Sequence, residues 1–242
     1  MRVAVISDIH ANARALEAVL ADIDAEAPDE LWCLGDVVGY GPDPDRCCEL
    51  IAQRATLCLA GNHDLAVTGE LSVADFNGDA ATAVRWTQQA ISPESLAFLR
   101  GLSPLTRREG VELFHGSPLD PVWDYVLSEQ TARHSFEVTH EPLLLVGHSH
   151  VSLALAFDGA TISGGIAIPN QTISLTNGRH LLNPGSVGQP RAKDPRSCWL
   201  LLDLDAAHAS FRRTAYPVAL TQQAIRDRGL PETLAARLAL GV

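Results

Sequence analysis

The sequence lacks any apolar run that approaches the length of a membrane-spanning helix. A helix needs about 20 consecutive apolar residues to cross a bilayer, and every apolar run among the 242 residues is shorter. The N-terminal run turns acidic at Asp8 and has no small-residue cleavage site, so it does not resemble a signal peptide. We therefore expect a cytoplasmic protein without a membrane partner.

Cysteine is also scarce, and the five cysteines form no recognisable pairing pattern. Their number is odd, Cys47 and Cys48 are adjacent, and no CxxC motif occurs. This pattern argues against a disulfide framework or a zinc knuckle. Cys33, Cys58 and Cys198 fall within apolar runs, where we expect them to act as small buried hydrophobic residues of strands.

Positive charge is the third shortage. The chain has 18 lysines and arginines against 29 aspartates and glutamates, which gives a formal net charge of −11. Such an acidic field repels polyanions and disfavours stable nucleic-acid binding. With 46% hydrophobic and 19% charged residues the chain is not a disordered one, and residues 1–242 are long enough for a single domain with a large core.

The first sixty residues alternate between strand and helix patterns. Apolar and β-branched runs predict strands at residues 2–7, 30–34 and 56–60, and helical spacing of apolar residues predicts helices at 12–26 and 43–52. This is the doubly wound α/β pattern, in which ligands bind beyond the carboxyl ends of the strands.

The remainder of the chain changes character near residue 150. Before it we expect a helical segment over 73–98, broken at Ser92-Pro93 with Ser92 as the cap of the second piece. After it, short apolar segments between Gly, Asn and Pro turns predict a second, mostly antiparallel sheet. The other predicted strands are 111–114, 143–146, 151–157, 160–168, 171–175, 199–204 and 210–214, and the other helices are 129–138 and 220–240, the latter broken at 229–231.

Five short polar segments stand where apolar runs end. Taken singly, each has a structural alternative, such as a helix cap for Asp8 or a turn for Asp36. Together they hold five of the nine histidines, and we expect the other four, His134, His140, His180 and His208, at the surface or in local hydrogen bonds. The segments are Asp8-Ile9-His10, Gly35-Asp36, Gly61-Asn62-His63-Asp64, His115 and Gly147-His148-Ser149-His150.

These residue types are suited to bind metal ions through nitrogen and oxygen. In extended backbone, residues i and i+2 point to the same side, so Asp8 and His10 would reach one ion, and His148 and His150 would bind one or two ions. The two oxygens of a carboxylate such as that of Asp36 can bridge two ions. Asn62 offers a neutral oxygen.

The histidine beside Asn62 has a different expected role. His63 would stand next to the metal ions and protonate a leaving oxygen as a general acid. Asp64 would orient His63 and raise its pKa, because a nearby anion favours the imidazolium form. The structural alternative for this segment is an ordinary turn with a capping aspartate.

The order of these motifs, D-x-H, GD, GNHD, H and GHxH, resembles the calcineurin-like metallophosphoesterase superfamily. The resemblance extends from Asp8 to about Arg191. Residues 35–42 and 183–191 are also similar to its small bacterial and archaeal phosphodiesterase branch. The resemblance implies a four-layer α/β/β/α sandwich of two mixed sheets.

The resemblance also implies a role for each matching residue. One divalent ion would be bound by Asp8, His10, Asp36 and His150. A second ion would be bound by Asp36, Asn62, His115 and His148, with Asp36 shared. His63 matches the catalytic or phosphate-binding histidine and Asp64 its partner, while Asn12 and Arg191 would contact the substrate phosphate. Ala11 departs from the branch, which often has glycine there. Mn²⁺, Fe and Zn²⁺ all suit such ligands.

These residues lead us to expect a metal-dependent phosphoric ester hydrolase in which a metal-bridging hydroxide attacks phosphorus. The alternative is a non-catalytic metal-binding scaffold of the same fold. A dinuclear amide or β-lactam hydrolase would need HxHxDH-like spacing, which is absent.

The substrate is expected to be a small phosphorylated or nucleotide-like molecule, and a phosphodiester, a phosphomonoester and a dinucleoside polyphosphate all remain open. Tyr40, Trp123 and Tyr125 would either stack on a nucleobase or pack against the protein, and we favour packing. Residues 69–136 are the expected position of a helical lid. The sequence leaves the oligomeric state open.

Overall fold

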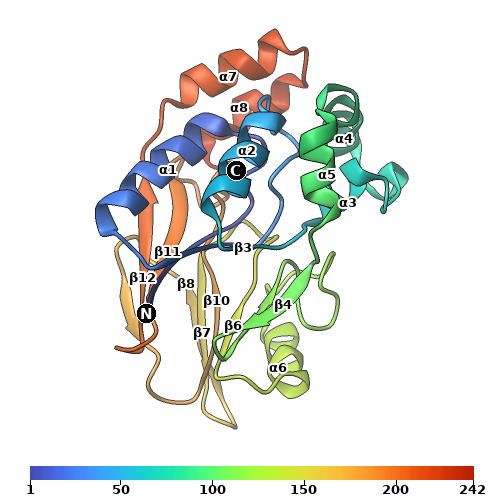
Figure 1. Ribbon diagram of the computed structural model, residues 1–242. Coiled ribbons are helices and arrows are strands. Elements are labelled where there is room, and N and C mark those ends of the chain that lie inside the picture. Colours follow the sequence, from blue (N-terminus) through green and yellow to red (C-terminus); the bar gives the residue numbers. More distant parts are fainter.

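The computed structural model describes residues 1–242 and contains two six-stranded mixed sheets (Figure 1). The first sheet has the order β3-β2-β1-β11-β12-β9. Its strands β1, β2 and β3 are parallel, as the alternating pattern of the first sixty residues predicts, and the other pairs are antiparallel. The strands are β1 (Arg2–Ile6), β2 (Glu30–Cys33), β3 (Leu57–Cys58), β9 (Thr172–Ser174), β11 (Ser197–Asp203) and β12 (His208–Thr214).

The second sheet has the order β4-β5-β6-β10-β7-β8. Its central strands β5, β6 and β10 are parallel to one another, and β4, β7 and β8 pair antiparallel to their neighbours. The strands are β4 (Leu105–Arg108), β5 (Val111–Phe114), β6 (Leu143–Leu145), β7 (Leu153–Phe157), β8 (Ile162–Ile166) and β10 (Arg179–Asn183).

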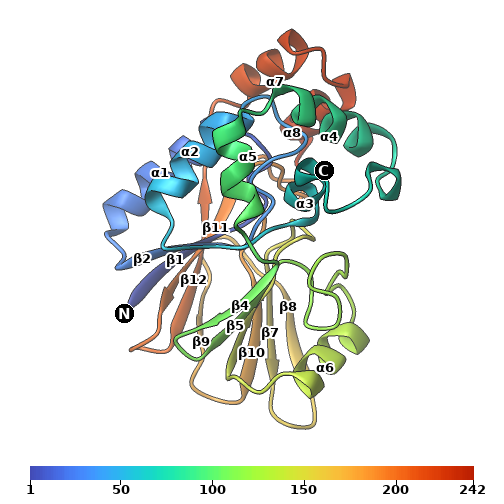
Figure 2. The same cartoon turned by 45° about the vertical axis from the view of Figure 1, so that its right-hand side comes forward.

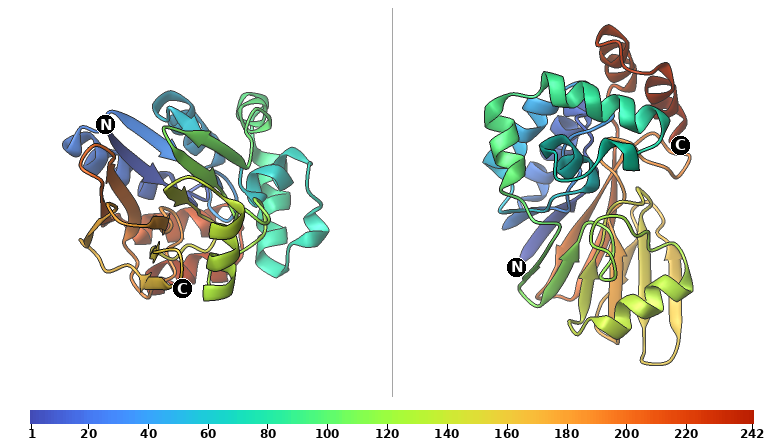
Figure 3. Two further views of the ribbon diagram at one scale, coloured as in Figure 1. Left: turned by 90° about the horizontal axis from the view of Figure 1, so that it is seen from below. Right: turned by 90° about the vertical axis from the view of Figure 1, so that its right-hand side faces the viewer.

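Helices cover both outer faces of the two sheets, as Figure 2 and the right-hand view of Figure 3 show. Helices α1, α2 and α5 lie on the side of the first sheet, and α6 lies on the side of the second. The helices are α1 (Ala13–Glu26), α2 (Pro44–Arg54), α3 (Asn62–Thr68), a 3-10 turn (Val73–Asp75), α4 (Gly78–Ala90), α5 (Pro93–Arg100), α6 (Glu129–Val138), α7 (Val218–Asp227) and α8 (Glu232–Leu240). None of them is long and apolar enough to cross a membrane.

Alternating side chains of the strands fill three apolar interfaces. In β1, Ala4 and Ile6 face the helices of the first sheet, whereas Val3 and Val5 lie between the two sheets. In β6, the flanking leucines join the layer between the sheets and Leu144 packs with the residues of α6. This period of two places one apolar face of each sheet against the other and the second face against helices. The predicted four-layer sandwich is confirmed.

The late strands are distributed differently from the prediction. The sequence after residue 150 predicts one further sheet, but only β7, β8 and β10 join the second sheet, while β9, β11 and β12 extend the first. The reason is the pairing of β11 with β1, which aligns Leu202 with Val3 across the chain. Local pattern carries no information on such a distant partner.

Several helix boundaries follow the sequence closely. The expected break at Ser92-Pro93 separates α4 from α5, and the Ser92 hydroxyl accepts a hydrogen bond from the Ser95 N–H at 3.2 Å, as a cap. The C-terminal helix is broken between α7 and α8 as predicted. Cys33 and Cys198 are buried in strands, but Cys58 is only partly buried.

Candidate metal centre

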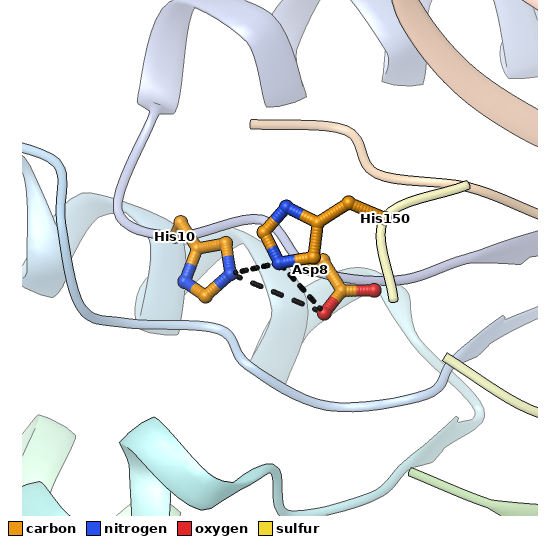
Figure 4. Close-up of side chains that lie close together, drawn as sticks. All are labelled: Asp8, His10 and His150. Atoms are coloured by element: carbon orange, nitrogen blue, oxygen red, sulfur yellow. Dashed lines mark hydrogen bonds and ion pairs between the residues drawn. The ribbon is translucent and has the colours of Figure 1, made fainter. Parts of the chain in front are cut away.

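The polar segments meet at one edge of the two sheets. Parallel strands place their carboxyl ends at the same edge, so β1, β2 and β3 bring their segments together, and β5 and β6 do the same in the other sheet. Asp8 and His10 follow β1, and His150 follows β6. Figure 4 shows these three side chains converging, Asp8 and His10 from the loop after β1 and His150 from the loop after β6.

The first cluster joins two histidines to Asp8. The His150 Nε2 atom lies 3.4 Å from Asp8 Oδ1, and the His10 Nε2 atom lies 3.9 Å from the same oxygen. The two Nε2 atoms are 3.0 Å apart. All three side chains are buried.

The second cluster is linked to the first through Asp36. The Asp36 Oδ2 atom lies 3.6 Å from His10 Nε2 and 3.5 Å from His115 Nε2. Asp36, His115 and His148 bring their ligand atoms within 4.8 Å of one another. One oxygen of Asp36 therefore lies between both clusters, where the sequence places the shared ligand.

The backbone at these positions is strained. Five of the seven predicted ligands have φ between +51° and +62°, the left-handed region that L-residues rarely adopt: Asp8, His10, Asp36, His148 and His150. Such conformations persist where the surrounding structure holds them, and they gather at functional sites. Ala11 also has a φ of +51°, a backbone conformation that glycine adopts more readily than alanine.

Neighbouring loops hold the strained segment after β1. The Asp8 N–H donates to the Gly35 carbonyl at 3.0 Å, and the Asp8 carbonyl accepts from the Gly188 N–H at 3.0 Å and from the Ser186 hydroxyl at 2.7 Å. The segment 183–191, which resembles the phosphodiesterase branch, thus has a structural role beside the first cluster.

Hydrogen bonds to the backbone fix the ring orientation of three histidines. The Nδ1 atoms of His10, His115 and His150 lie 3.2, 2.8 and 2.7 Å from the carbonyl oxygens of Val38, Leu34 and Gln189, respectively. Each Nδ1 must therefore carry the proton in the neutral ring, which leaves the Nε2 lone pair directed at the cluster. The His148 ring has the opposite orientation, since its Nε2 atom and not its Nδ1 atom lies near a backbone carbonyl, 3.2 Å from that of Trp123.

This donor set fits a metal ion. The neutral His10 and His150 rings present two Nε2 lone pairs to each other without a proton to share, and a cation would resolve that repulsion. Both carboxylate oxygens of Asp8, the Asn62 Oδ1 and the His115 Nε2 are buried without a hydrogen-bond partner. Buried polar atoms without partners are rare, and here they coincide with predicted ligands.

Burial keeps most of the imidazoles neutral. It lowers the pKa of His148 to about 3 and the pKa values of His10 and His150 well below the usual range. Burial also opposes charge on His115, but the Asp36 carboxylate outweighs it and raises the pKa of His115 to about 10. Burial raises the pKa of Asp8 to about 7. A metal ion would replace the protons on His115 and Asp8, because ligands bind it in their deprotonated forms.

His63 lies beside both clusters. Its ring is buried and contacts the rings of His10, Tyr40 and Phe76 at centroid distances of 4.9, 4.4 and 5.0 Å. Its Nδ1 atom has no hydrogen-bond partner. Its backbone N–H donates to Asp36 Oδ1 at 2.9 Å, so the start of α3 holds the shared carboxylate.

Asp64 does not have the predicted partner. Its carboxylate accepts hydrogen bonds from the backbone N–H groups of Gly61, Val37 and Val38 at 2.9, 3.2 and 3.0 Å, and it makes none to the His63 ring. As the third residue of α3, its side chain turns back to the start of the helix. Burial lowers the pKa of His63 to about 4, whereas the sequence predicts a raised value from Asp64. Asp64 therefore positions loops and does not orient the ring.

Asn12 also has a different role from the predicted phosphate contact. Its Oδ1 accepts from the Ala15 N–H at 3.2 Å, which caps α1, and from the Thr221 hydroxyl at 3.0 Å. Its Nδ2 donates to the Gly188 carbonyl at 2.9 Å and to the Tyr216 hydroxyl at 3.3 Å. These internal bonds occupy both polar atoms of the side chain, so Asn12 is a structural residue.

Arg191 lies at the cavity beside the two clusters, and its contact with a substrate phosphate stays a prediction. Together with Asp36, Asn62 and His63 it lines a polar cavity of about 120 Å³. Its Nη2 donates to the Gln189 side chain at 3.2 Å, its Nε has no partner, and it forms no ion pair with a carboxylate. An unpaired guanidinium at a metal-binding cavity suits a phosphate oxygen.

Sequence reasoning missed the contribution of Phe76, which also lines the cavity. The sequence predicts Phe76 within a helical segment, and no local signal marks it as a site residue. Residues 69–136 supply Phe76 and Trp123 to the cavity, and the closing of this segment over a substrate stays a prediction. The four remaining histidines behave as predicted: His134, His140 and His208 are exposed, and His180 is bonded locally to the Asn177 carbonyl at 3.0 Å.

Comparisons with known proteins show the family of this chain. The sequence-family model of the calcineurin-like phosphoesterase superfamily domain matches residues 1–207 of this chain. An uncharacterised protein of Methanocaldococcus jannaschii is 35% identical over 247 residues, covering 99% of this chain and 98% of that protein. The crystal structure of a metallophosphoesterase from Sphaerobacter thermophilus has a TM-score of 0.90 and 40% identity, covering 100% of this chain and 99% of that one.

A hypothetical protein from Pyrococcus horikoshii shares the fold, with a TM-score of 0.79 and 20% identity over 100% of this chain and 98% of that chain. The two sheets and the histidine and aspartate clusters at their common edge define a metal-dependent phosphoric ester hydrolase. The chain belongs to the calcineurin-like phosphoesterase superfamily.

Proposed function

We propose that this protein hydrolyses phosphodiesters of small molecules at a dinuclear metal centre. The observation that carries the proposal is the position of Asp36, whose Oδ2 lies within 3.6 Å of His10 Nε2 and of His115 Nε2. One ion would be held by Asp8, His10, Asp36 and His150. The other would be held by Asp36, Asn62, His115 and His148.

The chain's own residues divide the work on the substrate. Two bound divalent ions would lower the pKa of a water molecule and neutralise charge on the phosphoryl oxygens. Arg191 would bind a phosphate oxygen with the guanidinium that no carboxylate pairs. His63 would donate to the leaving oxygen, since bound phosphate is an anion that favours the protonated ring.

The alternative, a non-catalytic scaffold, has no observation in its favour. A scaffold needs neither His63 nor an unpaired Arg191 in the cavity, and both are present. Manganese, iron and zinc remain equally suited to the mixed nitrogen and oxygen ligands.

The test is hydrolysis of bis(4-nitrophenyl) phosphate with added Mn²⁺, together with the metal content per chain. His63→Ala should retain two metal ions and lose turnover about 10²- to 10⁴-fold, the usual contribution of a general acid. His208→Ala, at an exposed histidine outside the site, is the matched control. Full turnover by His63→Ala would exclude the acid role, and one ion per chain would exclude the dinuclear centre.

A substrate panel then separates the remaining possibilities. It should contain mono- and bis-nitrophenyl phosphate, cyclic nucleotides and dinucleoside polyphosphates. We expect kcat/KM for diesters to exceed that for the monoester, because a single guanidinium, Arg191, is suited to the single negative charge of a diester. Faster cleavage of the monoester would contradict the diester assignment.

A further inference from the structure

The rim of the metal-binding cavity is rich in aromatic rings. The whole chain contains only four tryptophans, three tyrosines and six phenylalanines. Four of these thirteen residues line this one cavity: Tyr40, Phe76, Trp123 and Tyr125. Such a concentration in an aromatic-poor chain requires either a packing role or a ligand.

Packing against the hydrophobic clusters accounts for two of the four rings. Tyr40 packs against the apolar cluster of α7 and α8, and Phe76 packs against the main core. Trp123 and Tyr125 belong to none of the hydrophobic clusters, and Tyr125 is 42% exposed. The predicted packing of Trp123 and Tyr125 is therefore local, against the rings of Phe76 and His148 at centroid distances of 5.0 and 4.1 Å, and not part of the core.

The loop that carries these two rings is held in place by its own hydrogen bonds. The Asp120 carboxylate accepts from the N–H groups of Val122 and Trp123 at 3.0 and 3.1 Å, and the Ser117 hydroxyl donates to the Asp124 carboxylate at 2.6 Å. The rings are thus presented at a fixed position, which reduces the entropic cost of binding a ligand.

Tyr125 is also fixed by its stacking on a predicted metal ligand. Its ring lies 4.1 Å from the His148 ring, with an angle of 7° between the planes. His148 covers one face of the tyrosine, and Tyr125 still keeps 42% of its surface exposed beside the cavity that it lines. A flat group stacked there would lie another roughly 3.5–4 Å beyond Tyr125.

The cavity is large enough for the phosphoryl group of a substrate but too small for the rest of the molecule. A cavity of about 120 Å³ is smaller than the roughly 300–1,000 Å³ of most small-molecule sites. A phosphoryl group fits inside, while the remainder of the molecule must lie against the rim.

We propose that Trp123 and Tyr125 form a stacking platform for the base of a nucleotide ester whose phosphate occupies the metal-binding cavity. This inference rests on the proposed function and names its substrate class. Stacking on aromatic side chains tolerates different bases, because every base has a π-face. The platform would therefore select nucleotides over other phosphate esters more strongly than one base over another.

The test compares AMP with ribose 5-phosphate as inhibitors of bis(4-nitrophenyl) phosphate hydrolysis by the metal-loaded enzyme. The two probes differ only in the base. AMP should inhibit about 5- to 150-fold more strongly, the range expected for stacking of one base. Equal inhibition would overturn the platform while leaving the phosphoesterase function intact, and absence of hydrolysis would instead refute the proposed function.

Substitutions of Trp123 and Tyr125 then test whether these two rings cause the preference for AMP over ribose 5-phosphate. Trp123→Ala and Tyr125→Ala should each reduce the ratio of the two inhibition constants toward one, and Tyr125→Phe should retain it. Because Tyr125 also contacts His148, the ratio within each variant is compared, so that a general loss of activity cancels. Leu119→Ala, at an exposed position of the same loop, is the control. An unchanged ratio in both alanine variants would overturn the proposal.

Discussion

At the scale of single residues, several residues of the site adopt backbone conformations that are unfavourable for L-amino acids and that the surrounding structure imposes. Asp8 and His148 adopt left-handed backbone conformations that cost free energy in an isolated chain. Backbone hydrogen bonds from the neighbouring loops hold Asp8, such as that to the Gly35 carbonyl. The strain fixes the directions of the ligands before any metal ion binds.

Gly61 illustrates how little space surrounds the shared carboxylate. A Cβ atom at Gly61 would lie 2.0 Å from Asp36 Oδ1, and the φ of −97° at Gly61 imposes no conformational penalty of its own. Gly61→Ala should therefore displace Asp36 and reduce kcat/KM about 10- to 100-fold. The measurement is steady-state hydrolysis at saturating metal.

Gly101→Ala is the matched control for this displacement. Gly101 has a φ of −84°, and a Cβ atom there would lie no closer than 3.4 Å to any neighbour. It should retain full activity. Wild-type kinetics in Gly61→Ala would show that Asp36 can move without consequence.

The convergence of the histidine and aspartate segments could be predicted from sequence, because their order and their places at strand ends are local features. The partners of Asp64 and Asn12 could not, because those partners come from distant loops. Asp64 bonds to Val37 and Val38, and Asn12 bonds to Thr221. The sequence around a side chain with several hydrogen-bonding atoms does not indicate which distant residues those atoms will bond.

At the scale of elements, Asn12 couples the start of α1 to the C-terminal helices. The Asn12 side chain caps α1 and also forms hydrogen bonds with the Thr221 hydroxyl of α7 and with the Gly188 carbonyl of the loop beside Asp8. Helix α7 is thereby attached to the elements that surround the first metal cluster.

Asn12→Ala should destabilise the protein by about 2–4 kcal/mol. About 1 kcal/mol comes from the lost cap, and the rest comes from buried groups such as the Thr221 hydroxyl and the Gly188 carbonyl that lose a partner. Urea denaturation measures the change. Asn77→Ala, at the start of α4 where the side chain makes no capping bond, should change stability by less than about 0.5 kcal/mol. Equal effects of the two substitutions would refute the coupling.

Elements with strong apolar runs were predicted well, and polar ones were missed. Strand β4 reads Leu-Thr-Arg-Arg and β10 begins with Arg-His, so neither has the alternation that marks a strand. Helix α3 has only seven residues and begins with Asn-His-Asp. Its helical hydrogen bonds arise because Gly61 and Asp64 close its first turn against the loop after β2.

At the scale of the whole molecule, the metal centre connects the two sheets. Asp8, Asp36 and Asn62 come from the first sheet, and His115, His148 and His150 come from the second. Buried carboxylates such as that of Asp8, which has no hydrogen-bond partner, destabilise the metal-free protein. Metal ions bound between the sheets should therefore stabilise the fold as a whole.

Removal of the metal should lower the thermal stability of the entire chain. Ions at 100 times their dissociation constant stabilise the folded state by about 2.7 kcal/mol per site, which corresponds to roughly 5–10 °C in Tm for a chain of this size. Scanning calorimetry with and without a chelator, followed by Mn²⁺ addition, measures the shift. In Asp36→Asn the metal-dependent increase in Tm should be smaller. Both ions should bind more weakly, because the substituted carboxylate lies between the two clusters. A full metal-dependent shift in Asp36→Asn would show that the two sites do not share Asp36.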